Sequence, residues 1–324
     1  MTSLEIIKSP IHEELKNFEK YFKEAIKSDI PFLQIIIRYV LKMKGKQMRP
    51  MFVFLSAKIC GEFNESTNLA ASSIELLHTA TLLHDDVVDE SYERRGRFSI
   101  NALWKNKIAV LVGDFILAKG MLNTLDNKEY RLLHLISRAV KDMSEGEILQ
   151  MRKSRKLDID NEIYFTIIRK KTASLIATSM AMGAASVTRD DEIVEKMFDI
   201  GLNVGIAFQI KDDIFDYQSK GILGKPTGND IKEKKITLPL LYVLNNCESG
   251  ERSRILQLIK RKNKNQAKVK ELVDLVVSRG GLEYAAEQMN EFCDKAIAGI
   301  MEFPESDARA ALIELVNYSI TRKK

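Results

Sequence analysis

Residues 68–89 are NLAASSIELLHTATLLHDDVVD, an apolar stretch that ends in three aspartates. Its apolar residues recur at three- and four-residue spacing, which predicts one long helix from Asn68 to Asp89. Positions i and i+4 of a helix share a face, so Asp85 and Asp89 lie together, with Asp86 about 100° around the axis. The stretch therefore ends in a one-sided acidic cluster.

The same pattern occurs again at Asp212, Asp213 and Asp216, at the end of a second apolar segment. Like charges about 4 Å apart repel by roughly 4 kcal/mol at an effective dielectric near 20. The dipole at the C-terminal end of a helix disfavours them further. Carboxylate oxygens select hard cations such as Mg²⁺. One such cluster is more often a solvated helix end, but two copies favour a metal site.

The remaining pattern predicts an all-α fold. Six prolines and 16 glycines separate long segments with helical spacing, and the period-two alternation of strands is nearly absent, so no sheet is expected. No linker divides residues 1–324, which predicts a single domain, a helical bundle around a central cavity. Three or four shorter helices are expected after Pro239. The earlier predicted helices are His12–Lys27, Pro31–Lys44, Pro50–Cys60, Asn68–Asp89, Ile108–Leu125, Glu129–Arg155, Asp160–Ala185 and Asp190–Tyr217.

Composition excludes several classes of protein. The 324 residues carry a net charge of only +5, from 50 basic and 45 acidic residues, which is too weak to indicate nucleic-acid binding. Cys60, Cys247 and Cys293 are far apart and have no metal-ligand spacing, so reduced thiols are expected rather than zinc or disulfides. No run of about 18 residues lacks charge, and the N-terminus lacks a targeting pattern. A soluble, cytoplasmic protein without a transmembrane segment is expected.

Basic residues follow both acidic clusters. Arg94 and Arg95 come after the first, and Lys225, Lys232 and Lys235 are among the lysines after the second. Arginine supplies bidentate donors and lysine a point charge, so carboxylates beside them indicate a site for magnesium and diphosphate. The P-loop spacing GxxxxGK[ST] is missing, which argues against a nucleotide site.

Five segments together are similar to the motif set of the trans-isoprenyl diphosphate synthases, or polyprenyl synthetase family. They are GKQMRP (45–50), LLHDDVVDESYERRG (82–96), KTASL (171–175), FQIKDDIFD (208–216) and GKPTGNDIKEKKITLP (224–239). The resemblance implies antiparallel helices around a deep hydrophobic cavity, a homodimer, and two or three Mg²⁺ ions per active site. It implies a trans-prenyltransferase that joins isopentenyl diphosphate to an allylic diphosphate.

The resemblance also implies a role for each matching residue. The magnesium carboxylates would be Asp85, Asp86 and Asp89, with Asp212 opposite, while Asp213 and Asp216 would act through water. The allylic diphosphate and its metals would be bound by Arg94, Lys171, Thr172, Gln209, Lys225 and Lys235. Isopentenyl diphosphate would be bound by Lys46, Arg49, His78 and Arg95. Two residues depart from the common motifs of the family. Gln47 stands where a basic residue is frequent, and Phe98 stands where proline is common.

The chemistry expected is ionisation of the allylic carbon–oxygen bond, attack by the isopentenyl double bond, and loss of a proton to the released diphosphate. Product length depends on the residues below the first acidic cluster. Ala80 and Thr81 lie about 6 to 8 Å deeper along the helix and are small, whereas bulky aromatics there close the cavity in short-chain members of the family. We therefore expect a heptaprenyl- or octaprenyl-class product, with Met121 as the candidate cavity floor, for quinone side chains, and a transient membrane contact on product release.

The sequence is compatible to different degrees with four other kinds of protein. A short-chain farnesyl or geranylgeranyl diphosphate synthase would share the chemistry. A class I terpene cyclase usually has a different second metal motif and needs no isopentenyl site. A catalytically silent subunit of a heteromeric synthase typically loses one aspartate motif, and both are intact here. A helical interaction protein that binds Ca²⁺ is disfavoured because the EF-hand pattern is absent.

Overall fold

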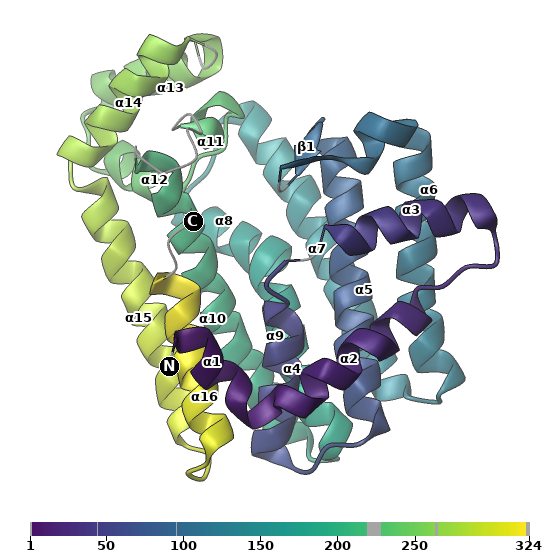
Figure 1. Ribbon diagram of the computed structural model, residues 1–324. Helices are drawn as coiled ribbons and strands as arrows, with labels where there is room; N and C mark the ends of the chain where they lie inside the picture. The colour runs from purple at the N-terminus through teal and green to yellow at the C-terminus, as the bar shows by residue number, and fades with distance from the viewer. Residues whose placement is uncertain (1, 44, 95, 219–227, 263–264, 322–324) are drawn as a thin grey trace. The chain divides into compact units, whose positions relative to one another are not determined.

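The computed structural model describes residues 2–43, 45–94, 96–218, 228–262 and 265–321, and these are almost entirely helical (Figure 1). The all-α class predicted from the sequence is confirmed. The chain forms two compact units. Unit 1 contains residues 1–140, 175–201 and 300–315, and unit 2 contains residues 141–174, 202–299 and 316–324.

Unit 1 is built mainly from the N-terminal half of the chain. Its helices bury a core rich in Ile, Leu, Phe and Ala side chains. Its elements are α1 (Ser3–Lys8), the 3₁₀ turn η1 (Ser9–Ile11), α2 (His12–Ala25), α3 (Pro31–Lys42), α4 (Met48–Cys60), α5 (Glu65–Val88), α6 (Ile100–Asp126) and most of α9 (Ser174–Val187). The first parts of α7 (Tyr130–Lys156) and α10 (Asp191–Tyr217) also belong to it, as does most of α16 (Asp307–Thr321).

Helix α5 carries the first acidic cluster and is fixed at both ends. Its N-terminus is capped by Asn64, whose side chain accepts from the Thr67 amide in a capping box. Along its length it packs tightly on α6. A β-carbon on Gly113 would stand 2.3 Å from the His84 ring, and one on Gly120 would stand 3.3 Å from Leu76. These two glycines let the helices approach closely, which fixes the rotation of α5 about its axis.

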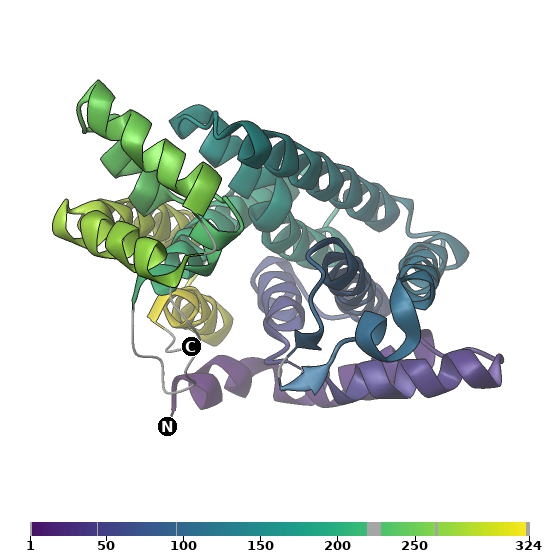
Figure 2. The ribbon, with the colours of Figure 1, turned by 90° about the horizontal axis from the view of Figure 1, so that it is seen from above.

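A small hairpin corrects the expectation of no sheet. Strands β1 (Glu93–Arg94) and β2 (Arg97–Phe98) pair antiparallel, with Arg94 opposite Arg97. Two-residue strands are too short to produce a period-two pattern, so the sequence did not reveal them. The Tyr39 hydroxyl of α3 donates to the Phe98 carbonyl over 2.7 Å, and Figure 2 shows the hairpin lying against α3.

Unit 2 contains the second acidic cluster. Its elements are the later parts of α7 and α10, α8 (Asn161–Ile168), the π-helical turn η2 (Arg169–Ala173), α11 (Asn229–Lys232), α12 (Leu238–Asn245), α13 (Ser249–Lys262), α14 (Gln266–Ser278) and α15 (Gly281–Met301). The sequence predicted three or four shorter helices after Pro239. Within the described residues, four helices, α13 to α16, begin after Pro239, and α12 contains it, so the predicted number is right; α15, with 21 residues, is however longer than α2, α3 and α4.

The predicted helix Asp160–Ala185 is also wrong in one respect, because a π turn divides it. The turn is packed on both sides by glycines. A β-carbon on Gly146 of α7 would stand 2.6 Å from the Lys171 amide nitrogen, and one on Gly205 of α10 would stand 2.4 Å from the Ala173 Cα. Single π turns are rare and often lie at functional sites. This one sets the positions of Lys171 and Thr172.

Candidate active site

The three aspartates of the first cluster have different surroundings. Helix α5 ends at Val88, and Asp89 is its C-cap, with its amide donating to the Asp85 carbonyl over 2.8 Å. Asp85 is half-buried and Asp89 is exposed, whereas the Asp86 side chain is only 1% exposed. The cluster therefore presents Asp85 and Asp89 to the surface of unit 1 and turns Asp86 inward.

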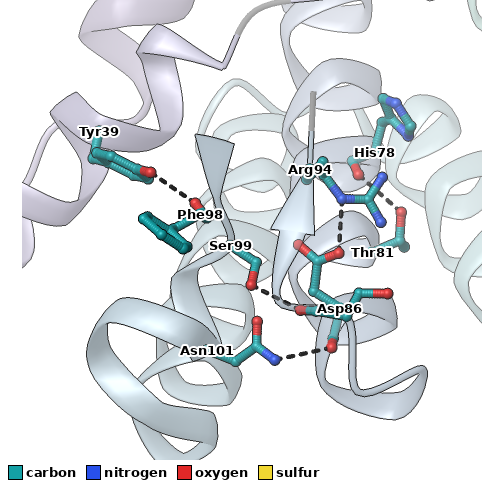
Figure 3. Close-up of polar contacts among 9 residues, drawn as sticks. Tyr39, His78, Thr81, Asp86, Arg94, Phe98, Ser99 and Asn101 are labelled. Atoms are coloured by element: carbon teal, nitrogen blue, oxygen red, sulfur yellow. Dashed lines mark hydrogen bonds and ion pairs between the residues drawn. The ribbon is translucent and has the colours of Figure 1, made fainter. Parts of the chain in front are cut away.

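Asp86 connects the helix to the hairpin (Figure 3). Its Oδ1 accepts from Arg94 Nε over 2.7 Å, and its backbone carbonyl accepts from Asn101 Nδ2 over 3.1 Å. Its Oδ2 atom is buried and has no hydrogen bond within the described residues. Burial raises the pKa of Asp86 and the charge of Asp89 adds to this, while the hydrogen bond and charge of Arg94 oppose it. Arg94 is thereby fixed beside the acidic cluster.

The residues expected to bind isopentenyl diphosphate are only partly together. His78, half-buried on α5, lines a cavity of about 60 Å³ that Gln47, Asp86 and Arg94 also line. Lys46 is exposed and lines a neighbouring, larger hollow that Gln47 shares. Arg49 is half-buried in the first turn of α4. Arg95 lies outside the described residues.

The candidate chain-length residues all lie in unit 1. Ala80 is fully buried, and Thr81 is half-buried with its hydroxyl donating to the His78 carbonyl over 2.9 Å. Met121 is half-buried on α6.

The second cluster is largely occupied by internal hydrogen bonds. Asp213, 4% exposed, accepts from the Tyr164 hydroxyl over 2.7 Å, from Gln209 Nε2 over 2.9 Å and from the Leu238 amide over 3.3 Å. Burial nevertheless raises the pKa of Asp213 to about 6. Asp212 is half-buried. Of the two adjacent aspartates, only Asp213 is thus held by this set of donors.

The buried Asp216 carboxylate forms the beginning of α11. It accepts from the backbone amides of Asn229 and Asp230, each over 3.0 Å. An N-terminal helix amide is an orphan donor, so this carboxylate stabilises the turn that follows the cluster. Gly228, at φ +75°, makes the return of the chain possible, and its amide donates to the Asp216 carbonyl over 2.9 Å.

A polar cavity of about 220 Å³ lies beside Asp213 within unit 2. Four residues expected to bind the allylic diphosphate line it, namely Lys171, Thr172, Gln209 and Lys235. The Thr172 hydroxyl donates to Gln209 Oε1 over 2.7 Å, so Thr172, Gln209, Asp213 and Tyr164 form one continuous chain of hydrogen bonds.

The two lysines of this cavity are held by acidic partners. Lys171 Nζ lies 2.5 Å from Glu147 and 2.6 Å from Gln150 Oε1, and Lys235 Nζ lies 2.5 Å from Glu233. A diphosphate entering the cavity would meet ammonium groups that are already oriented. Lys225 lies outside the described residues.

Two cavity residues were missed by the sequence analysis. Tyr164 lies about two helical turns before Lys171, where a tyrosine in an apolar segment indicates nothing beyond packing. Asp230 stands inside a quoted motif but received no role. Burial, followed by the charges of Asp213 and Asp216, raises the pKa of Asp230 to about 8. Both Asp213 and Asp230 therefore keep their protons to a higher pH than an ordinary aspartate, because the pKa of each is raised.

The donor set suits a hard cation that retains water and phosphate ligands. Throughout the described residues, no three His, Cys, Asp or Glu side chains are already gathered as a metal cage. Mg²⁺ does not require one, because it is normally bound by one or two carboxylates together with substrate phosphates. The surface pair Asp85 and Asp89, with the unsatisfied Asp86 oxygen beneath them, fits that description.

Helical packing, paired acidic clusters and a lysine-lined polar cavity define a helical enzyme for diphosphate substrates. The family model of polyprenyl synthetases matches residues 30–276. An all-trans-nonaprenyl-diphosphate synthase (geranyl-diphosphate specific) of Rhodobacter capsulatus is 36% identical, over 98% of this chain and 97% of its own. The octaprenyl diphosphate synthase of Escherichia coli is 34% identical, over 99% and 100%.

A solved structure of the same kind is a polyprenyl synthase from Caulobacter crescentus, complexed with calcium and isoprenyl diphosphate. It superposes with a TM-score of 0.91 at 32% identity, over 99% of this chain and 98% of that one. The chain belongs to the polyprenyl synthetase family. It is a trans-prenyltransferase that condenses isopentenyl diphosphate with an allylic diphosphate, as the sequence motifs predicted.

Proposed function

We propose that the protein makes a long-chain all-trans polyprenyl diphosphate of the heptaprenyl or octaprenyl class for quinone side chains. The observation that carries the proposal is the pair Ala80 and Thr81, two small residues one turn below the first acidic cluster. The long-chain products named for its relatives support it. The test is incubation with Mg²⁺, farnesyl diphosphate and labelled isopentenyl diphosphate, followed by chromatography of the dephosphorylated alcohols. A discrete product of about 35 to 40 carbons is expected, and one of 15 or 20 would overturn the length assignment.

Met121 is the proposed cavity floor. Replacing it with alanine would deepen the cavity by most of a side chain without introducing charge, so Met121→Ala should shift products toward longer chains. Ala80→Phe should do the opposite and shorten them, at an overpacking cost of about 1–3 kcal/mol in stability. Unchanged product lengths in Met121→Ala would exclude Met121 as the floor.

Magnesium would be held by Asp85, Asp86, Asp89 and Asp212. When bound, it neutralises charge that develops on the departing diphosphate. Asp213 and Asp216, already hydrogen-bonded within unit 2, would act indirectly through water and through the backbone they position. The polyprenyl synthase of Caulobacter crescentus, which is complexed with calcium and isoprenyl diphosphate, supports a divalent cation beside this class of substrate.

Each of the two substrates would be bound by its own set of residues. Arg94, Lys171, Thr172, Gln209, Lys225 and Lys235 would hold the allylic diphosphate, and Lys46, Arg49, His78 and Arg95 the isopentenyl diphosphate. The allylic carbon–oxygen bond breaks with its electron pair leaving on the diphosphate. The isopentenyl double bond then attacks the cation, and the released diphosphate takes the proton. Residues such as Lys171, already oriented by Glu147, lower the barrier by stabilising the leaving group.

We also propose a homodimer that covers α6. By length and composition alone this helix is apolar enough to cross a membrane, and only 33% of its most apolar window is buried. One such helix is weak evidence for a membrane span, and a second copy of the chain would cover it equally well. Leu111→Lys should therefore convert a dimer into a monomer in light scattering, and an unchanged mass would contradict this interface. The large exposed apolar side chains of α6 are Leu103, Val110, Leu111, Leu122 and Leu125.

The remaining proposals concern the domain organisation of the chain and its place in the cell. The family match extends across residues of both compact units, which supports one functional polyprenyl synthetase domain over residues 1–324. A cytoplasmic protein is proposed, with a transient membrane contact when the apolar product leaves.

A further inference from the structure

A basic hollow of about 300 Å³ in unit 1 includes Lys46 and Gln47 of the GKQMRP segment, but most of its lining residues belong to no sequence motif. It lies among the N-terminal helices and the loop before α4. Lys8, His12, Leu15, Lys16, Glu19, Lys46, Gln47 and Met51 line it. Of these residues, only Lys46 has been assigned a substrate above.

The charges of this hollow are unbalanced. Four basic side chains face it and Glu19 is the single acidic one. Lys8, His12 and Lys16 are exposed and make no ion pair within the described residues. His12 and Lys16 are four positions apart on α2, an arrangement of basic residues that does not stabilise a helix by itself. A bound anion would reduce the repulsion between these basic side chains.

The basic side chains are presented by a rigid framework. Phe18 and Phe22 of α2 are buried in the core, which fixes the rotation of the helix. The flanking Ile7 and Ile11 are fully buried as well. Figure 1 shows α2 crossing α4, and the Lys58 ammonium of α4 donates to the Pro10 carbonyl of η1, the turn just before α2. Lys8, His12 and Lys16 are therefore directed toward the hollow before any ligand arrives.

We propose that this hollow is an outer subsite for a diphosphate group, formed by Lys8, His12 and Lys16 beside Lys46. Lysines bind phosphate oxygens as point charges. Leu15 and Met51 provide an apolar wall that suits a five-carbon chain, so isopentenyl diphosphate is the expected ligand and the free diphosphate product is the other source of the same group. The identity of the ligand rests on the proposed function, whereas binding of a diphosphate does not.

The test is calorimetric titration of the full chain with inorganic diphosphate and with isopentenyl diphosphate. EDTA is included so that metal-dependent binding at the aspartates does not contribute. The variant Lys8→Gln/Lys16→Gln is compared with Lys20→Gln/Lys23→Gln, which removes the same charge from α2 outside the hollow. About tenfold weaker binding is expected in the first variant only. Equal affinities in both variants would overturn the subsite.

Steady-state kinetics separate this proposal from the proposed function. Lys8→Gln/Lys16→Gln should raise KM for isopentenyl diphosphate about tenfold, and leave kcat and KM for the allylic substrate unchanged. Tighter binding of isopentenyl than of inorganic diphosphate would identify the substrate as the ligand, and the reverse would identify the product. A wild-type chain that incorporates no isopentenyl diphosphate would refute the proposed function, while the titrations would still decide whether the hollow binds diphosphate.

Discussion

The two acidic clusters have the same pattern of aspartates and different physical environments. In the first, Asp85 and Asp89 reach the surface and only Asp86 is buried, paired with Arg94 at 2.7 Å. In the second, both Asp213 and Asp216 are buried and are held by neutral donors. The first cluster thus presents two carboxylates at the surface, as the proposed magnesium site requires, whereas most of the second maintains the backbone around a cavity. Two aspartate motifs of the same pattern can therefore have different roles in one protein.

The largest effect should come from the surface aspartates of the first cluster. Asp85→Asn keeps the shape of the side chain and removes one negative charge, so activity should fall about 10³-fold while stability is retained. Incorporation of labelled isopentenyl diphosphate measures it. Glu90→Gln, an exposed acidic neighbour just beyond the helix, is the matched control and should remain active. Equal losses in both variants would mean that overall charge, not the cluster, matters.

The free energy of unfolding should depend on pH through the buried Asp213 of the second cluster. The pKa of Asp213 is raised to about 6 in the folded protein, above about 4 in the unfolded chain, so the folded state binds more protons between these values. Its contribution is present below pH 4 and is lost as the pH rises through 6, by about 3 kcal/mol. Urea unfolding between pH 4 and 7.5 should show a loss that is smaller in Asp213→Asn than in wild type by this amount, because Asp230, whose pKa is raised to about 8, contributes a further loss in both. Parallel curves would contradict the buried assignment.

A smaller effect is expected from the tyrosine that donates to Asp213. Tyr164→Phe removes one hydrogen bond to a buried carboxylate, so the free energy of unfolding should fall by about 1–3 kcal/mol. Tyr284→Phe is a suitable control, because Tyr284 stacks on Tyr242 through its ring. If both variants were equally stable, the hydroxyl of Tyr164 would not support the cavity.

The smallest change in stability is expected at the last aspartate of each cluster, Asp216 or Asp89. Asp216→Ala should cost about 1 kcal/mol in thermal or urea unfolding, because two amides at the start of α11 lose their acceptor. Asp89→Ala should cost no stability, because a carboxylate at the C-terminal end of α5 is disfavoured by the helix dipole. Activity should show the opposite order. Destabilisation by Asp89→Ala would mean that the first cluster is structural too.

Much of the fold and of the candidate site could be predicted from the sequence, because helical periodicity and short sequence motifs are local properties of the chain. The long helices α5 and α10, both acidic clusters, the lysines and the family all follow from residues close together in the chain. The sequence alone also shows that position 80 carries a small alanine and not a bulky aromatic residue.

Only the tertiary structure decided which aspartate is buried, because burial depends on what packs against each face. Asp86 is covered by the hairpin, and Asp213 by Tyr164 from another helix; neither contact has a periodic signature. The π turn at Lys171 likewise depends on Gly146 and Gly205, which are distant in sequence. The basic hollow arises because Phe18 and Phe22 of α2 are buried in the core, while Lys8 of α1 and His12 and Lys16 of α2 line the same hollow as Lys46. Periodicity predicts which face of a helix is apolar, while packing determines what the other face meets.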